Sequence, residues 1–305
     1  MKARDRQRIL ILLLASVLII SGCSQENEKT YKPTVSDSPE RSGVPVYIFS
    51  IHPLHNPMRL HQVFWPMIDY LNRNIHNAQF KLEASRNYTA YEAKLYDGQA
   101  HFSLPNPLQA IKSLKHGYRI FGKMGDDNNF RGIILVRKDS GIKKVEQLKG
   151  KAISYPAPYA LIATLMPQYY LYTHGLDVMH DTETRYVGSQ ESSIMNVYLG
   201  NTAAGATWPP PWYALMEERP ELKEALEVKW QTDSLPNNAL VVRKDVPAEL
   251  VHQVADLLFN LHTHEEGRQI LNRMKLTRFE PATEQTYQKV VEFIAIFSKT
   301  VRPVE

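Results

Sequence analysis

The stretch AHFSLPNPLQAIKSLKHGYRIFGKM, residues 100–124, contains a short apolar run, a segment with apolar residues at helical spacing, and a second apolar run. These patterns predict a strand, a helix and a strand. The same order precedes this stretch in residues 44–95 and follows it in residues 151–207. Repeated alternation of strands and helices favours mixed or parallel sheets with helical crossovers, so we expect an α/β fold.

Two near copies of one apolar run, GIILVRKD at residues 132–139 and ALVVRKD at residues 239–245, lie far apart in the chain. We interpret them as two hinge strands between which a second lobe is inserted. Lobe 1 would then comprise residues 44–136 and 238–305, and lobe 2 residues 137–237. The length of this part of the chain suits two compact units.

The N-terminal residues have the order of an export signal. Basic side chains within residues 2–8 precede an apolar run at residues 9–20 that is shorter than the roughly 20 residues needed to span a bilayer. Residues 20–23 resemble the bacterial lipoprotein box, in which the cysteine is acylated. We therefore expect a lipoprotein signal peptide at residues 1–22 and lipidation, typically with palmitate, at Cys23; an ordinary cleaved signal is the alternative.

The mature protein would be anchored to a membrane on the extracytoplasmic, periplasmic side of the cell envelope. Residues 23–43 carry only Tyr31 and Val35 as sizeable apolar groups, which predicts a disordered tether. Residues 1–22 hold four basic residues and one acidic residue, so their removal lowers the formal net charge from +4 to +1. A nucleic-acid partner is therefore not expected.

Cys23 is the only cysteine, which leaves no disulfide framework and no catalytic thiol. The sequence also lacks a G-x-S-x-G elbow, a phosphate-binding P-loop and an H-E-x-x-H helix, so we expect a protein that is not an enzyme and needs no cofactor. His52, His55 and His61 raise the possibility of a metal site, but their spacing is loose and we interpret them as polar residues at the rim of a cleft.

Ligands of α/β proteins collect where strands end and helices begin, because unpaired N–H groups and helix dipoles converge there. Six loops of this chain have that position, and we expect all six to face one cleft. They are residues 50–56, 85–88, 104–107, 154–159, 188–192 and 207–212.

The pattern resembles the periplasmic phosphate, phosphonate and phosphite-binding components of ABC transporters, a branch of the type II periplasmic binding proteins. The motifs that carry the resemblance are PMIDYL, NYTAYEAKLYDGQAHFSLPNPLQA, VRKDSGIKKVEQLKGKAIS, GSQESS and EGRQIL, which begin at residues 66, 87, 136, 188 and 266. The resemblance implies two lobes, each a sheet with flanking helices, that are joined by two hinge strands and close over a small ligand.

The resemblance also assigns ligand contacts by position. Tyr88 matches a tyrosine that begins the family's second helix, Asn106 lies in the third strand-end loop, and Glu191 matches a family carboxylate. Gln190 stands where a histidine is common, and Thr207 stands near where the family often has an aspartate.

One segment departs from the family. Where a Ser-Thr-Ser-Gly run would wrap the phosphonate oxygens, this chain has Pro158-Tyr159-Ala160-Leu161. Hydroxyl donors are lost, and Pro158 lacks a backbone N–H. A tetrahedral oxyanion would therefore lose several hydrogen bonds at this segment.

Aromatic residues occupy the loops instead. Tyr155, Tyr159 and Trp208 are expected ligand contacts that would suit an apolar, aromatic or cationic solute, with Glu191 as the single charge. The segment Pro209–Pro211 would hold Trp208 and Trp212 on a stiff polyproline-type path. The alternative, that both tryptophans only seal the second lobe, remains open.

These observations predict a monomeric, lipid-anchored solute-binding protein that delivers a small ligand to an ABC permease. The same fold could instead serve a membrane sensor kinase or a respiratory complex as a sensing or assembly module, and the exposed tryptophan–proline segment would then dock the partner.

Overall fold

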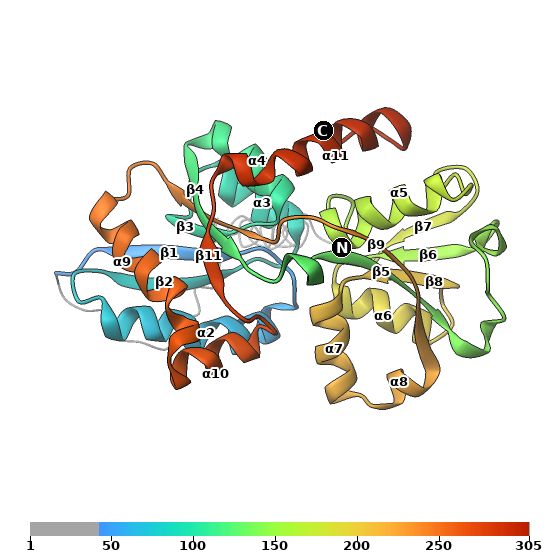
Figure 1. The fold of residues 1–305 in the computed structure, drawn as a ribbon, viewed down its shortest axis with the longest axis horizontal. Coiled ribbons are helices and arrows are strands. Elements are labelled where there is room, and N and C mark those ends of the chain that lie inside the picture. Colours follow the sequence, from blue (N-terminus) through green and yellow to red (C-terminus); the bar gives the residue numbers. More distant parts are fainter. Residues whose placement is uncertain (1–42, 305) are drawn as a thin grey trace, which may run out of the picture. The chain divides into compact units, whose positions relative to one another are not determined.

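A computed structural model describes residues 43–304 of the chain. The expected signal peptide, Cys23 and nearly all of the tether lie outside the described residues. Two mixed β-sheets flanked by helices make up the described part, as the sequence predicted (Figure 1). No helix in residues 43–304 has the length and apolar character needed to cross a membrane.

The first sheet has six strands and contains both directions. Strand β1 is parallel to β2 and β3, whereas β10 is antiparallel to β3 and β4, and β11 is antiparallel to β4. Across the sheet the order is β11 (Phe279–Pro281), β4 (Tyr118–Met124), β10 (Ala239–Arg243), β3 (Phe102–Leu104), β1 (Val46–Ile51) and β2 (Gln79–Ala84).

The second sheet has five strands. Strand β6 is parallel to β7 and β8, and β5 is antiparallel to β8 and β9. Across the sheet the order is β7 (Glu183–Tyr186), β6 (Ala152–Tyr155), β8 (Ala204–Thr207), β5 (Arg131–Arg137) and β9 (Leu226–Ser234).

Helices cover the sheets by their apolar faces. The first sheet carries α2 (Pro57–Asn74), α3 (Tyr88–Tyr96), α4 (Pro107–Ser113), α9 (Ala248–Phe259), α10 (Glu265–Arg273) and α11 (Gln288–Thr300). The second carries the π-helical turn η5 (Leu161–Leu165), which continues into α5 (Met166–Thr173), and α6 (Gln190–Tyr198), α7 (Pro209–Glu218) and α8 (Glu221–Ala225).

The chain crosses from the first sheet to the second between β4 and β5 and returns between β9 and β10. The near copies GIILVRKD and ALVVRKD are therefore not hinge strands: β5 lies wholly in the second sheet and β10 wholly in the first. Each is an inner strand buried on both faces, which explains its apolar run. The crossings are residues 125–130 and 235–238, so β5 belongs with lobe 2; the division into lobes otherwise stays a prediction.

Close packing at the start of the site fixes one residue type. A Cβ atom at Gly205 of β8 would lie 2.5 Å from Val197 Cγ2 and 2.6 Å from Ser154 Oγ. Only glycine lets β8 approach α6 so closely, and this approach sets the height of the α6 N-terminus at the end of the sheet.

Candidate functional site

A buried cavity lies where loops from the two sheets meet. Five of the six strand-end loops expected from the sequence contribute to it, and the sixth ends one residue before the next lining segment. The cavity is small, with about 10 Å³ open to the centre of a water molecule. The lining residues are His52, Tyr88, Asn106, Phe130, Ala160, Leu161, Ile162, Ala163, Gln190, Trp208 and Asn238.

Tyr88 is the first residue of α3 and is buried against the cavity. The helix begins there because the side chain of Asn87 accepts a hydrogen bond from the N–H of Ala90 at 2.9 Å. Burial raises the pKa of Tyr88 well above its usual value, and a hydrogen bond with Gln190 offsets this only in part. The phenol therefore keeps its proton and can donate a hydrogen bond to a guest.

Asn106 holds the start of α4. Its Oδ1 accepts from the N–H of Gln109 at 3.0 Å, and Gln109 Oε1 accepts from the N–H of Asn106 at 3.1 Å, which forms a capping box. Its Nδ2 donates to the carbonyl of Tyr159 at 3.4 Å. Asn106 thus links the first sheet to the loop that precedes α5.

Gln190 and Thr207 act as a pair. Ser189 caps α6, with its Oγ accepting from the N–H of Ser192 at 3.1 Å, and places Gln190 in the first turn. Thr207 is fully buried at the end of β8 and donates to Gln190 Oε1 at 2.8 Å. This contact leaves the amide nitrogen of Gln190 for the cavity side, so Thr207 acts through Gln190.

Glu191 is bonded to His55 of the loop before α2, with 3.0 Å between Nδ1 and Oε1. Burial raises the pKa of Glu191, but the hydrogen bond and charge of His55 outweigh it and hold the pKa below the usual value. The second carboxylate oxygen, Oε2, is buried and has no hydrogen-bond partner. Glu191 therefore joins elements of the two sheets beside the cavity.

Two further ion pairs join residues in or near helices of the first sheet to helix α7 of the second. Arg59 of α2 contacts Glu218 at the end of α7 at 2.5 Å, and Lys275 after α10 contacts Glu217 of α7 at 2.7 Å. Because both carboxylates are more than half exposed, water and salt screen these pairs strongly. They steer the approach of the two sides more than they hold it.

His52 faces the cavity in its neutral form. Its Nδ1–H donates to the carbonyl of Leu104 at 2.8 Å, which leaves Nε2 as an acceptor. Burial lowers the pKa of His52 to about 4, against the raising effect of the Leu104 hydrogen bond. At neutral pH the cavity therefore has an imidazole lone pair here and no positive charge.

The segment that replaces the hydroxyl run still offers backbone donors. Residues 161–163 begin the η5–α5 helix, so their N–H groups have no acceptor within it, and all three line the cavity. Arg302 fixes the preceding turn by donating from Nη2 to the carbonyl of Pro158 at 2.6 Å. The ring of Tyr159 lies under Lys112 and Arg302, with the cations 5.3 Å and 5.9 Å from its centroid.

The aromatic residues divide between cavity and core. Trp208 lines the cavity and meets Phe130 edge to face, with ring centroids 5.5 Å apart. Trp212 packs in the core between β5 and α6, where it seals the second lobe. Tyr155 is fully buried in the other core of the second sheet, beside Tyr186 and away from the cavity lining.

The prolines remove donors from α7. Trp208 is the N-cap residue, and Pro209–Pro211 occupy the first three helical positions. Proline has no N–H, so this helix end lacks most of the donors that ordinarily attract an anion. The starts of α3, α6 and the η5 turn keep their N–H groups.

The histidines near α2 have separate partners. His55 bonds Glu191, His52 bonds Leu104, and His61 stacks on Trp65 with centroids 5.4 Å apart. Among the described residues no group of three potential metal ligands is clustered.

Seven lining residues were not among the predicted contacts: His52, Phe130, Ala160, Leu161, Ile162, Ala163 and Asn238. Phe130 and Asn238 lie in the two crossing segments. The polar run GDDNN at residues 125–129 and Asn237-Asn238 after Pro236 mark these crossings in the sequence and could have located both residues.

Two sheets linked by two crossings, with a small cavity at the strand ends between them, define a type II periplasmic binding protein. Residues 49–287 match the family model of the periplasmic substrate-binding protein of phosphonate ABC transporters, so the chain belongs to that family. The family consists of extracytoplasmic binding components and not of enzymes, as the sequence predicted.

A curated relative is the probable phosphite-binding protein PhnD1 of an ABC transporter in Prochlorococcus marinus (strain MIT 9301). It is 24% identical over 179 residues, which span 54% of this chain and 60% of the relative's length. The solved PhnD1 of that organism, in complex with methylphosphonate, has a TM-score of 0.76 at 19% identity and covers 83% of this chain and 98% of its own.

A second solved structure, a binding protein component of an ABC phosphonate transporter from Pseudomonas aeruginosa, also gives a TM-score of 0.76. Its identity is 17%, and the match covers 84% of this chain and 88% of that one. These likenesses support the fold.

Proposed function

We propose that this protein is the receptor of an ABC importer and captures a small tetrahedral oxyanion of the phosphonate or phosphite type. The observation that carries the proposal is the convergence of loops from both sheets on one buried cavity. A guest there would touch both lobes only when they are closed, so it would favour the closed form by its differential affinity.

The donor set supports an oxyanion although the Ser/Thr run is absent. Tyr88, Gln190 and the N–H groups of residues 161–163 supply hydrogen-bond donors, and no Lys or Arg is among the lining residues. Such a cavity suits a small anion of low charge held by neutral donors. The relative crystallised with methylphosphonate makes that compound the first ligand to test.

Isothermal titration calorimetry of the mature protein with methylphosphonate, phosphite and phosphate tests the proposal. We expect one saturable site for at least one of them. Tyr88→Phe removes the hydroxyl and keeps the ring, and should weaken binding about tenfold, which is about 1.4 kcal/mol. Tyr213→Phe, at a half-exposed position on α7, is the matched control and should bind as the wild type does.

Silence of the wild type toward all three compounds would refute the oxyanion receptor. A panel of aromatic and cationic solutes would then test the other guest class that Trp208 favours, because rigid rings bind such molecules by stacking and cation–π contact.

We also propose that the chain is held at the membrane by lipid on Cys23, which would keep the receptor near its permease. Cys23→Ser should move the protein from the membrane fraction to the soluble fraction, and mass spectrometry of the N-terminal peptide should find acyl chains only in the wild type. An unmodified N-terminal peptide in the membrane-bound wild type would contradict the anchor.

A further inference from the structure

Asn238 has a buried oxygen that nothing in the described protein satisfies. The residue is the last of the second crossing, directly before β10, and is 1% exposed. It lines the cavity, and its Oδ1 has no hydrogen-bond partner. Buried amide oxygens normally have a donor, because leaving one unpaired is costly.

Neighbouring groups fix the orientation of the Asn238 amide. The Nδ2 of Asn238 donates to Met124 Sδ at 3.6 Å, and its backbone N–H donates to Asn237 Oδ1 at 2.7 Å. The carbonyl of Asn238 accepts from the N–H of Met124 at 2.9 Å. With the amide nitrogen and the backbone held by neighbours, Oδ1 is the group left for a guest.

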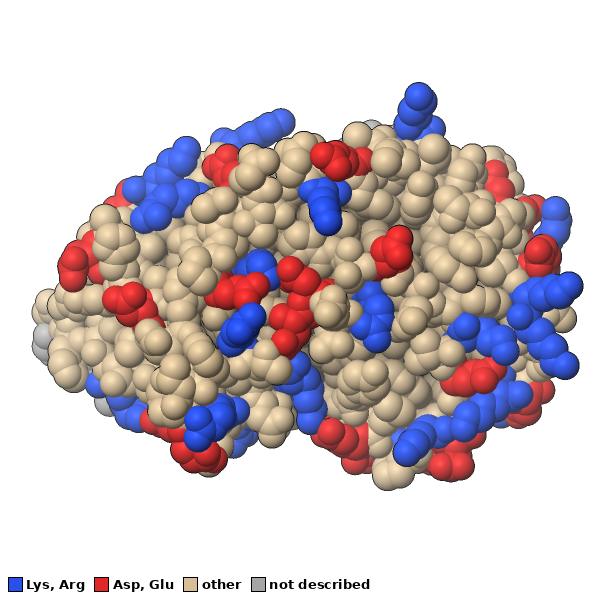
Figure 2. Space-filling model, viewed as in Figure 1, with Lys and Arg blue, Asp and Glu red and all other residues tan. Residues whose placement is uncertain are grey.

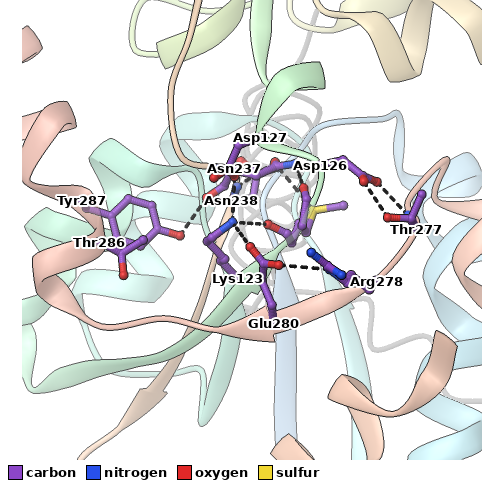
Figure 3. Close-up of polar contacts among 12 residues, drawn as sticks. Lys123, Asp126, Asp127, Asn237, Asn238, Thr277, Arg278, Glu280, Thr286 and Tyr287 are labelled. Carbon is purple, nitrogen blue, oxygen red and sulfur yellow. Dashed lines mark hydrogen bonds and ion pairs between the residues drawn. The ribbon is translucent and has the colours of Figure 1, made fainter. Parts of the chain in front are cut away.

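Asn237, next to it, fastens the two crossings together (Figure 3). Its N–H donates to Asp127 Oδ1 at 2.9 Å, its Nδ2 donates to the carbonyl of Gly125 at 2.7 Å, and its carbonyl accepts from Tyr287 at 2.7 Å. Lys123, which is almost fully buried, adds an ion pair with Asp127 at 2.7 Å.

Lys123 also pairs with Glu280 at 2.5 Å, so β11 is tied to the same network. Acidic and basic side chains are interspersed at the middle of this face of the molecule (Figure 2). The network pins the backbone on which Asn238 stands, so the position of Oδ1 is set before any guest arrives.

Two of the lining residues carry hydrogen-bond acceptors. His52 Nε2 is a lone pair in the neutral ring, and Asn238 Oδ1 is a second acceptor among the lining groups. A fully deprotonated oxyanion has only acceptors to present to them. A singly protonated oxyanion presents one O–H and satisfies one of them.

We propose that Asn238 is a ligand contact that selects the singly protonated form of a tetrahedral oxyanion by accepting its O–H. The inference rests on the proposed function and adds the residue and the protonation state. Tyr88 and the N–H groups of residues 161–163 then serve the oxygens without a proton.

The test compares methylphosphonate with methanesulfonate by calorimetry at pH 6. The two ions have nearly the same shape and the same single charge, but only methylphosphonate has an O–H. We expect the wild type to prefer methylphosphonate at least thirtyfold, and Asn238→Ala to reduce that preference to about threefold. Above the second ionisation of methylphosphonate, wild-type affinity should fall about tenfold per pH unit.

Two variants keep the result interpretable. Asn238→Asp retains an acceptor of the same shape, so it should bind both ions more weakly and still prefer methylphosphonate. Tyr213→Phe, at a half-exposed position on α7 outside both the cavity lining and the network around Asn237, should leave the preference unchanged.

An equal preference in the wild type and Asn238→Ala, or one that Tyr213→Phe abolishes equally, would overturn the role of Asn238 while the receptor function stands. A wild type that binds none of the phosphorus oxyanions would overturn the receptor function and this inference together.

Discussion

Burial of His52 makes a quantitative prediction about acid stability. Its pKa is lowered from 6.5 to about 4 in the folded protein, chiefly by desolvation. Between these two values the unfolded chain takes up a proton at His52 and the folded chain does not, so stability falls as the pH falls. The two pKa values with 1.36 kcal/mol per unit give a loss of about 2.5 kcal/mol between pH 7 and pH 4.5.

The perturbation is His52→Asn, which keeps an N–H near Nδ1 to donate to Leu104 and removes the titrating group. Urea denaturation of both proteins at pH 7 and pH 4.5 measures the free energy of unfolding. Between pH 7 and pH 4.5 the free energy of unfolding of the variant should fall by about 2.5 kcal/mol less than that of the wild type, whatever its value at pH 7. Exposed His262→Asn is the control and should follow the wild type. If the difference in free energy of unfolding between wild type and variant does not change with pH, His52 is not a buried imidazole with a lowered pKa.

Other predictions concern the contacts around the cavity. Glu191→Gln removes the charge paired with His55 and should weaken ligand binding by about 1–2 kcal/mol, with small-angle scattering of the liganded variant showing a larger radius of gyration. Asn106→Ala loses the capping box and should lower the free energy of unfolding by about 1 kcal/mol in urea denaturation. Gly205→Ala forces a methyl group against α6 and should destabilise by about 3 kcal/mol, seen as a lower denaturation midpoint. Arg302→Ala frees the turn before α5 and should speed ligand release in stopped-flow measurements; an unchanged off-rate would contradict it.

The fold could be predicted from the sequence because apolar periodicity and strand-end loops are local signals. Tyr88, Asn106 and Gln190 reach the cavity because each stands where a helix begins, after the short loop that follows a strand. The near copies were wrongly interpreted as hinge strands for a physical reason. Apolar runs mark strands buried on both faces, as β5 and β10 are, whereas a chain segment that crosses between sheets is polar and irregular.

The sequence could not predict which aromatic side chains of the second lobe line the cavity and which pack in the core. Trp208 and Trp212 lie one helical turn apart in one motif, yet one lines the cavity and the other packs in the core. Tyr155 ends β6 with its side chain on the core side, because alternate residues of a strand point to opposite faces and the register alone decides which. Asn238 was missed because an asparagine after Leu-Pro-Asn suggests a turn, and only the packed structure leaves its oxygen unpaired.

Helix α7 follows the lining residue Trp208 at one end and carries the charged contacts with the first lobe at the other. Its 10 residues make a rod of about 15 Å, stiffened at the start by consecutive prolines. If a guest shifted Trp208, a rigid α7 would move Glu217 and Glu218 with it. Because these ion pairs are exposed, the salt concentration would change how fast the two sides come together, through groups that never meet the solute.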